Sequence, residues 1–154
     1  MMTKAPQHYV WRGFHELSAT ELYLLLRLRC EVFVVEQQCA YLDIDGRDHE
    51  AVHLLAFAGN HRLSGYLRVF APTPGNAAAQ IGRIVTARED RSSGLGRWMV
   101  QEALRFIAER HGGVAVKLSA QVYLERFYAG FGFARSSGDY SEDGIPHCDM
   151  LRAP

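Results

Sequence analysis

Apolar and polar positions follow two different periods along this chain, and the change of period separates helices from strands. After Ser18, apolar side chains recur at the three- and four-residue spacing of one helix face, at Leu22, Leu25, Leu26, Cys30 and Phe33. Ser18 and Glu21 fit a capping box, in which the serine side chain accepts from the Glu21 amide and the glutamate reaches back. The pattern predicts a helix that begins after Ser18 and places Cys30 in the core.

The middle of the chain reads as strands. Residues 52–58 and 63–70 are apolar runs joined by a tight turn at Gly59 and Asn60, which predicts a hairpin. Two prolines and a glycine interrupt 71–76, so this segment is expected to be a loop before a further strand at 80–86.

The second half returns to helical spacing. One apolar face is formed by Leu95, Trp98, Met99, Ala103, Phe106 and Ile107. Gly112 and Gly113 are expected to end this helix. A strand at 114–118, a short helix at 122–129 and a final strand region from 131 to 133 follow. Because the 154 residues suit one domain, we expect residues 1–154 to form a single α+β domain around one sheet.

Composition narrows the function. The chain has 17 Lys plus Arg and 17 Asp plus Glu, so it lacks the basic surplus that a sequence-independent nucleic-acid binder needs. No apolar run approaches the ~18 residues of a membrane span, and the first 14 residues do not resemble a secretion signal. Three cysteines without close spacing suggest neither a disulfide framework nor a zinc site. We therefore expect a cytoplasmic protein with no nucleic-acid partner, no membrane partner and no metal.

The segment 91–97 is a small-residue loop that follows the strand at 80–86 and opens a helix. Gly94 and Gly96 allow backbone amides to approach a ligand with no side chain between them, and the free amides at a helix start favour an anion. A charge-assisted hydrogen bond contributes about 1.5–3 kcal/mol, so a few of them could hold a pyrophosphate.

Two familiar phosphate motifs do not fit this loop. A Walker loop requires GxxxxGK[ST], which is absent, and a dinucleotide fingerprint requires a third glycine where this chain has Met99. On the loop alone, a phosphate site and a pair of glycines that only caps a helix are equally good interpretations. A second motif separates them.

That motif is Phe127-Tyr128 followed by F-G-F at 131–133. Together with R-x-x-G-x-G at 91–96, it resembles the GNAT superfamily of acyl-CoA-dependent N-acetyltransferases. Further stretches are similar to the ElaA-like branch of that superfamily, namely RCEVFVVEQ at 29–37, DIDG at 43–46 and EDGIPH at 142–147. The resemblance extends from Phe14 to Met150, and its motifs are specific in combination.

The resemblance implies a fold and a co-substrate. The fold would be an α/β sandwich with a twisted mixed sheet of about six or seven strands, whose central strands splay apart between helices on both faces. The co-substrate would be acetyl-CoA, with its pantetheine arm paired to the backbone of Ile84, Val85 and Thr86. Its pyrophosphate would lie on the loop, contacted by Arg91, Ser92, Ser93, Gly94, Leu95, Gly96 and Arg97.

Tyr128 is the residue to which the resemblance assigns a catalytic role. A tyrosine at this motif position lies near the thioester sulfur, where it would protonate the departing thiolate. A phenol with a pKa near ~10 can donate to the thiolate of a thiol with a pKa near ~8.5. The alternative is a packed aromatic residue with a satisfied hydroxyl group. Gln121 stands where many members have an asparagine that holds pantetheine, so it keeps the amide and adds a methylene.

The sequence does not identify the residue that acts as the general base. Many GNAT enzymes use a glutamate on or near the strand that here spans 80–86, but this strand offers Arg83 and no carboxylate. The two catalytic candidates are Glu36, whose pKa an apolar neighbourhood would raise, and His147, which follows a turn. Each residue also has a purely structural interpretation: Glu36 as a carboxylate at the end of a helix, and His147 as a side chain that braces the turn.

Other titratable residues also have two interpretations. His53 lies in an apolar strand and is better explained as a hydrogen-bonded core histidine. Asp43, Asp45 and Asp48 would either attract a cationic amine or form a solvated loop.

The sequence therefore favours an N-acetyltransferase that transfers an acetyl group from acetyl-CoA to a primary amine of a small molecule or peptide by direct attack. The family also allows a homodimer. One alternative is a CoA-binding sensor or interaction module that lost turnover, which the missing carboxylate supports. The other is acyl transfer in signal synthesis, since R-x-x-V-F at 29–33 resembles acyl-homoserine-lactone synthases, although the short chain and the motif at 127–133 argue against it.

Overall fold

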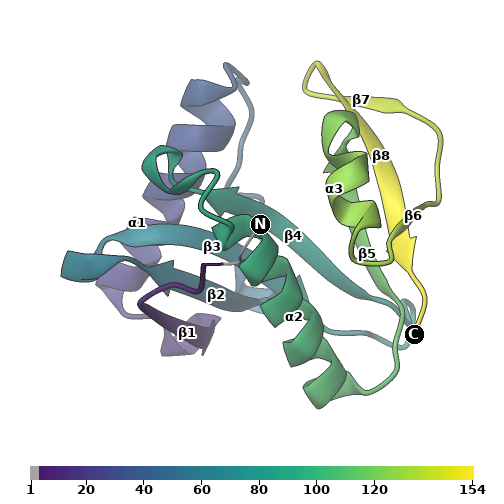
Figure 1. Ribbon diagram of the computed structural model, residues 1–154, viewed down its shortest axis with the longest axis horizontal. Coiled ribbons are helices and arrows are strands. Elements are labelled where there is room, and N and C mark those ends of the chain that lie inside the picture. Colours follow the sequence, from purple (N-terminus) through teal and green to yellow (C-terminus); the bar gives the residue numbers. More distant parts are fainter. Residues whose placement is uncertain (1–3) are drawn as a thin grey trace.

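The computed structural model describes residues 4–154, which form one mixed sheet between helices on both faces (Figure 1). The strand order is β1-β2-β3-β4-β5-β8-β6, and β7 pairs with β8. The strands are β1 His8–Gly13, β2 Val52–Phe57, β3 Leu63–Phe70, β4 Ala79–Thr86, β5 Val116–Gln121, β6 Ala134–Arg135, β7 Tyr140–Glu142 and β8 Ile145–Arg152. The main helices are α1 Ala19–Arg29, its π-helical continuation η2 Cys30–Glu36, α2 Leu95–His111 and α3 Glu125–Ala129. This is the α+β fold that the sequence predicts.

Helix α1 begins as the sequence predicts, but its buried face differs. Ser18 accepts from the Glu21 amide, and Glu21 accepts from the Ser18 amide, which completes the capping box. The buried apolar positions are Leu25, Leu28 and Val32. Arg29 occupies the remaining buried position, four residues after Leu25, so Cys30 is turned outward and is exposed. The prediction that Cys30 lies in the core is therefore wrong.

The central strands β4 and β5 diverge. They are paired in parallel only at Ala79 with Val116 and at Gln80 with Lys117. Beyond these residues the two strands separate, as Figure 1 shows, while β5 stays paired with β8 as far as Gln121 and His147. The splayed centre expected from the resemblance is thus present. The strand predicted at 114–118 begins later, at Val116, and ends at Gln121.

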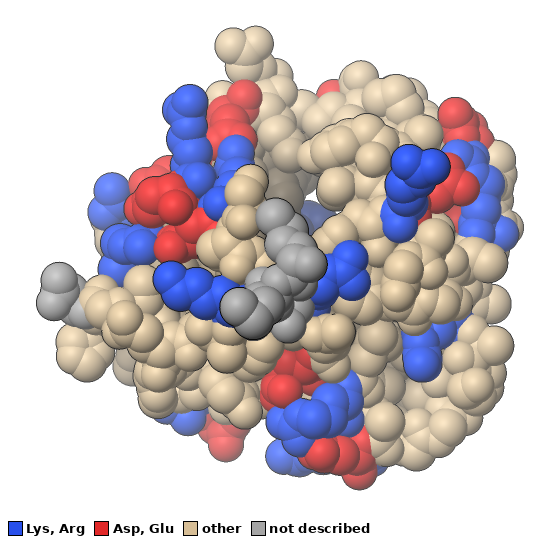
Figure 2. Space-filling view, viewed as in Figure 1, with Lys and Arg blue, Asp and Glu red and all other residues tan. Residues whose placement is uncertain are grey.

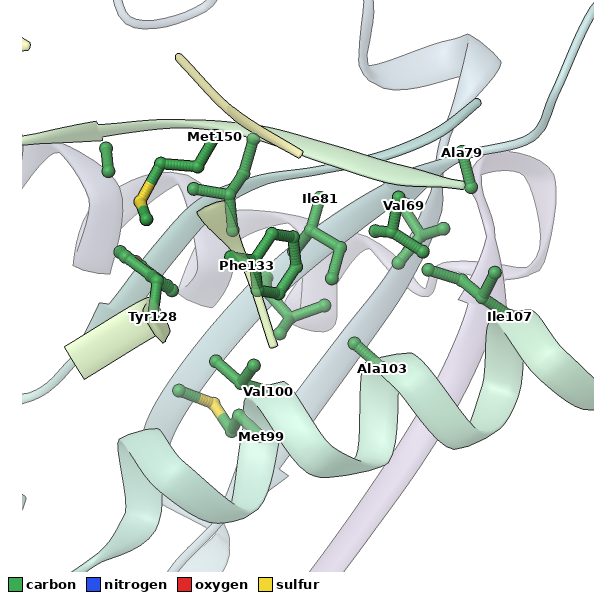
Figure 3. Close-up of a cluster of buried hydrophobic side chains, with 14 of the residues drawn as sticks. Val69, Ala79, Ile81, Met99, Val100, Ala103, Ile107, Tyr128, Phe133 and Met150 are labelled. Atoms are coloured by element: carbon green, nitrogen blue, oxygen red, sulfur yellow. The ribbon is translucent and has the colours of Figure 1, made fainter. Parts of the chain in front are cut away.

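Two apolar cores hold the layers together. Helices α2 and α3 cover the core shown in Figure 3, where Met99 and Val100 lie beneath Tyr128 and Phe133. Helix α1 and η2 cover the other face, against β2 and β3. Residues 131–133, from which the sequence predicts a final strand region, form the turn after α3, with a φ of 86° at Gly132, and lead into β6 at Ala134.

Candidate active site

A cleft of about 690 Å³ opens where β4 and β5 diverge. It is lined by the end of η2 and the segment after it, by strands β3, β4 and β5, by the start of α2 with α3, and by the hairpin of β7 and β8. Its volume is that of an ordinary ligand pocket. The splay therefore creates a cavity that touches both halves of the sheet.

The loop before α2 presents backbone amides at this cleft. Gly94 is the N-cap of α2 with a φ of 89°, a left-handed conformation that favours glycine. A methyl group on Gly96 would lie 4.0 Å from Thr86 Cγ2, an ordinary contact, so packing alone does not require a glycine there. The first amides of a helix have no partner within it. Here the amide of Leu95 donates to Ser93 Oγ at 3.4 Å, whereas the amides of Gly96, which lines the cleft, and Arg97 have no acceptor among residues 4–154. This arrangement can bind an anion.

The outer half of β4 has an open backbone edge toward the cleft. Ile84, Val85 and Thr86 lie beyond the last pairing with β5. A β-bulge precedes them, because the pairing with β3 shifts at Arg83, which has a φ of 54°. An unpaired strand edge can hydrogen-bond to an extended chain of amides. The edge and the loop are close enough together to line one cavity.

Tyr128 lies on the opposite wall. Its side chain is 6% exposed and sits edge-on between the rings of Phe127 and Phe133 (Figure 3). Burial raises the pKa of the phenol above its usual value, so the hydroxyl is protonated at neutral pH. Within residues 4–154 this hydroxyl has no hydrogen-bond partner, although the residue lines the cleft. A free phenolic proton is therefore available there.

His147 and Gln121 face each other across β5 and β8 near Tyr128. His147 Nδ1 lies 2.7 Å from the carbonyl oxygen of Ile145, to which it donates. In the neutral ring, Nε2 is then the acceptor, 3.6 Å from a Glu142 carboxylate oxygen. Gln121 donates to Gln37 Oε1 at 3.3 Å, across the cleft. His147 thus braces its turn and also lines the cleft.

Glu36 is also in the cleft, but its environment is not the one expected. Its carboxylate accepts from both terminal nitrogens of Arg91, at 2.5 and 3.0 Å. These hydrogen bonds hold the pKa of Glu36 below its usual value, against a smaller effect of burial. The expectation of a raised pKa is therefore wrong, because the charge of Arg91 outweighs the apolar residues before Glu36. Arg91, at the entrance of the loop, is tied to η2.

The acidic segment after η2 forms an ion-pair network with three arginines. We call it the Arg–Asp network, and its members are Arg29, Arg68, Arg83, Asp43, Asp45 and Asp48. Arg29 lies 2.8 Å from both Asp43 and Asp48, and Arg68 lies 2.7 Å from Asp48. Asp43 and Asp48 are buried. The acidic run is therefore neither a solvated loop nor a free attractor for an amine, since arginines already neutralise it.

His53 contacts the backbone of the Arg–Asp network. Its Nε2 lies 2.8 Å from the Asp48 carbonyl oxygen and its Nδ1 2.7 Å from the Tyr66 hydroxyl. Burial lowers the pKa of the fully enclosed imidazole, which favours its neutral form. The prediction of a hydrogen-bonded core histidine is confirmed.

Arg29 and Arg68 were missed by the sequence reasoning, although a signal was present. Arg29 lies on a helix face next to leucines, and Arg68 lies inside the apolar strand β3. A charged residue in an apolar run requires a buried partner. The nearby acidic segment from 43 to 48 could have supplied it.

Comparison with known proteins identifies the family. A family model described as an acetyltransferase (GNAT) domain matches residues 7–153. This chain belongs to the GNAT acetyltransferase family. For this GNAT protein, membership indicates acyl transfer from coenzyme A. It also agrees with the splayed sheet and with the loop at the start of α2.

Relatives place this GNAT protein in the ElaA-like branch. Protein ElaA of Escherichia coli is 38% identical over 146 residues, covering 92% of this chain and 95% of ElaA. Its crystal structure aligns with a TM-score of 0.87 at 36% identity, covering 94% of this chain and 98% of that one. An acyl-CoA N-acyltransferase from Pseudomonas aeruginosa aligns with a TM-score of 0.90 at 38% identity, covering 95% and 99%. The CoA-dependent acyl-homoserine lactone synthase BjaI shares the fold alone, with a TM-score of 0.75 at 17% identity over 94% of this chain and 81% of that one.

A membrane-spanning helix and a metal-binding cluster are both absent from the part of the chain that the structure describes. No helix within 4–154 has the length and apolar character needed to cross a bilayer. In the same part of the chain, no group of three or more His, Cys, Asp or Glu side chains is placed to hold a metal ion. Basic and acidic side chains are interspersed on the face shown in Figure 2.

Proposed function

We propose that this GNAT protein is an N-acetyltransferase that transfers an acetyl group from acetyl-CoA to a primary amine of a small molecule or peptide. One observation carries the proposal: the divergence of β4 and β5 opens a single cleft onto three features. These are the free amides that open α2, the unpaired edge of β4 and the protonated hydroxyl of Tyr128. An anion site, an amide-pairing edge and a proton donor are what a thioester of coenzyme A requires.

In this proposal the pantetheine arm pairs with 84–86, and the pyrophosphate lies on the amides of the loop at 91–97. Gln121 contacts the arm from the opposite wall. The amine nitrogen attacks the thioester carbon directly, a C–N bond forms and the C–S bond breaks. The base takes one proton from the ammonium group before attack. After attack the nitrogen loses a second proton, which replaces the one that Tyr128 gives to the departing thiolate, so coenzyme A leaves as the thiol. Proximity within the cleft supplies much of the acceleration.

A base is needed because of the amine's own acidity. A lysine-like amine with a pKa of ~10.4 is almost entirely protonated at pH 7, which costs about 4.6 kcal/mol. His147 fits this role, because its Nδ1 donates to the Ile145 carbonyl oxygen, which leaves Nε2 as the acceptor whenever the ring is neutral. Glu36 fits it less well, because its pKa is lowered and both of its oxygens are paired with Arg91. We assign to Glu36 the positioning of Arg91.

Two substitutions separate these roles. His147→Gln is expected to lower kcat/KM for the amine by about 10²–10⁴-fold, the usual effect of losing a general base. Glu36→Gln is expected to change mainly the KM for acetyl-CoA, because it releases Arg91 but removes no base. Steady-state kinetics with both substrates measures this. The opposite pattern, with turnover lost only in the Glu36 variant, would assign the base to Glu36.

Amine-dependent release of CoA tests the proposed activity. Purified protein with acetyl-CoA is given a panel of primary amines, and free thiol is followed with a colorimetric reagent. The exposed Cys30 also reacts with such reagents, so a blank without acetyl-CoA is subtracted. Release that depends on the amine supports the transferase, whereas binding of acetyl-CoA without release from any amine would favour a sensor. Activity only with acyl-carrier-protein thioesters and S-adenosylmethionine would favour signal synthesis.

A further inference from the structure

The cleft extends away from the glycine loop toward the start of β4. Phe70 at the end of β3 pairs with Gln80, which lies six residues before Thr86 along β4. At about 3.3 Å per residue this is about 20 Å of strand. The side chains of Arg47, Phe70 and Gln80 line the cleft at this end. The cavity therefore has room for an acceptor beyond the place proposed for the thioester.

Guanidinium groups dominate this acceptor end. The charged side chains that line it are Arg47, Arg68, Arg83 and Asp45. In the Arg–Asp network behind them, three arginines and three aspartates balance. Arg47 is not a member of this network, and its carboxylate neighbour is the half-exposed Glu50, with an oxygen 3.7 Å from its Nε. Three guanidinium groups thus lie at this end of the cleft beside Asp45, while Glu142 and Asp143 line the cleft from the hairpin of β7 and β8.

Several of these guanidinium donors have no hydrogen-bond partner among the described residues. Arg83 Nε lies 2.8 Å from Asp43 Oδ1 without a hydrogen bond, Nη2 donates to the Asp43 carbonyl oxygen and to Asp45, and Nη1 has no partner within residues 4–154. The side chain of Arg47 makes no hydrogen bond within residues 4–154. Arg68 is 3% exposed and its Nε has no partner, although its terminal nitrogens bind Asp45 and Asp48. Donors without acceptors in a cleft favour an anionic ligand.

The surroundings also hold these groups in place. The Arg47 guanidinium lies 4.2 Å from the centre of the Phe70 ring, and that of Arg83 lies 5.9 Å from the Tyr41 ring. Asp43 fixes Arg83 and is itself fixed by the buried Arg29. Donors that are already ordered lose less entropy when they bind an anion.

The geometry points to an acceptor that carries a carboxylate as well as its primary amine, such as an amino acid or a short peptide acid. This inference rests on the proposed function and names its substrate class. Planar guanidinium groups bind a carboxylate through two parallel hydrogen bonds, and the unused donors of Arg47, Arg68 and Arg83 can supply them. A polyamine fits poorly beside these arginines, because Asp45, the carboxylate that lies among them, already contacts Arg68 and Arg83.

Matched acids and amides test the inference. Acetyl-CoA turnover is measured with the amino acids H₂N–(CH₂)n–COOH, from glycine to 6-aminohexanoate, and with the corresponding carboxamides. We expect kcat/KM for at least one acid to exceed that of its amide by about tenfold, the loss of one charge-assisted hydrogen bond. For the shortest pairs the amide has the less basic amine, so intrinsic reactivity opposes this preference. The chain length that gives the largest ratio measures the span from thioester to arginine.

An arginine variant with a matched control locates the site. Arg47→Gln is expected to remove most of the acid preference, because kcat/KM should fall further for the acids than for the matched amides. Arg110→Gln is the control, because Arg110 is also exposed and lies over a phenylalanine ring, that of Phe106, outside the cleft. Amides used as well as acids would overturn the inference alone, as would a preference that survives Arg47→Gln. No turnover with any amine, charged or neutral, would instead overturn the proposed transferase activity on which it rests.

Discussion

Replacing Tyr128 with phenylalanine is expected to lower kcat for acetyl transfer by about 10²–10⁴-fold and to leave the affinity for acetyl-CoA nearly unchanged. The substitution removes one oxygen atom. That oxygen belongs to a hydroxyl group with no partner among residues 4–154, so its loss leaves no broken hydrogen bond in the free protein. The rings of Phe127 and Phe133 pack against the ring that both side chains share. The effect should therefore fall on the proton transfer.

Steady-state kinetics and calorimetric binding of acetyl-CoA measure the two effects separately. Tyr23→Phe is the matched control, since Tyr23 is 67% exposed on α1 and does not line the cleft. The control should behave like the unchanged protein in both measurements. Equal losses of turnover and acetyl-CoA affinity in Tyr128→Phe, or no loss of turnover, would refute the role of Tyr128 as the acid.

Replacing Arg29 with leucine is expected to lower the free energy of unfolding by about 3–5 kcal/mol. Arg29 is fully buried and makes 2.8 Å contacts with both Asp43 and Asp48. It also donates to the Asp43 carbonyl oxygen at 2.9 Å. Without it, two buried carboxylates lose a compensating charge, although Arg68 and Arg83 still contact them. Such a loss is a large share of the stability of a small domain.

Arg27 provides the control two residues earlier on the same helix. Its side chain is 63% exposed and pairs with Glu31 at 2.7 Å, four residues on. Because exposed pairs contribute little, Arg27→Leu is expected to leave the free energy of unfolding close to that of the unchanged protein. Urea unfolding, followed by circular dichroism, measures both variants. If both variants lost similarly little free energy of unfolding, the Arg–Asp network would not be a stabilising part of the acceptor end.

Local features of the fold could be predicted from the sequence because their causes are local. The capping box at Ser18 and Glu21 is formed by residues three apart, and the glycine that ends α2 lies directly after its last residue. The burial of Arg29 could not be predicted in the same way. It depends on aspartates 14 and 19 residues away, which the folded segment after η2 brings back to the helix. That burial also turns Cys30 outward.

Residues that a motif marks lie at the cleft, whereas contacts that depend on long-range packing could not be predicted. The loop at 91–97 and Tyr128 carry recognisable motifs, and both lie at the cleft. The environment of Glu36 depends on Arg91, which is 55 residues away along the chain. The bulge at Arg83 was not predicted although Gly82 lies beside it, because the positive φ of Arg83 accompanies the shifted pairing of β3 and β4. Contacts of this kind require the fold.

Calorimetric titration of the purified protein with acetyl-CoA tests the central claim most directly. The same titration with ATP and NAD controls for general affinity toward phosphates and adenine. If the free amides of α2 and the open edge of β4 form the co-substrate site, acetyl-CoA should bind with a micromolar dissociation constant and the two controls should not. No binding of acetyl-CoA to a sample shown to be folded by circular dichroism would mean that Gly94 and Gly96 only begin a helix, and would contradict the proposed acetyltransferase.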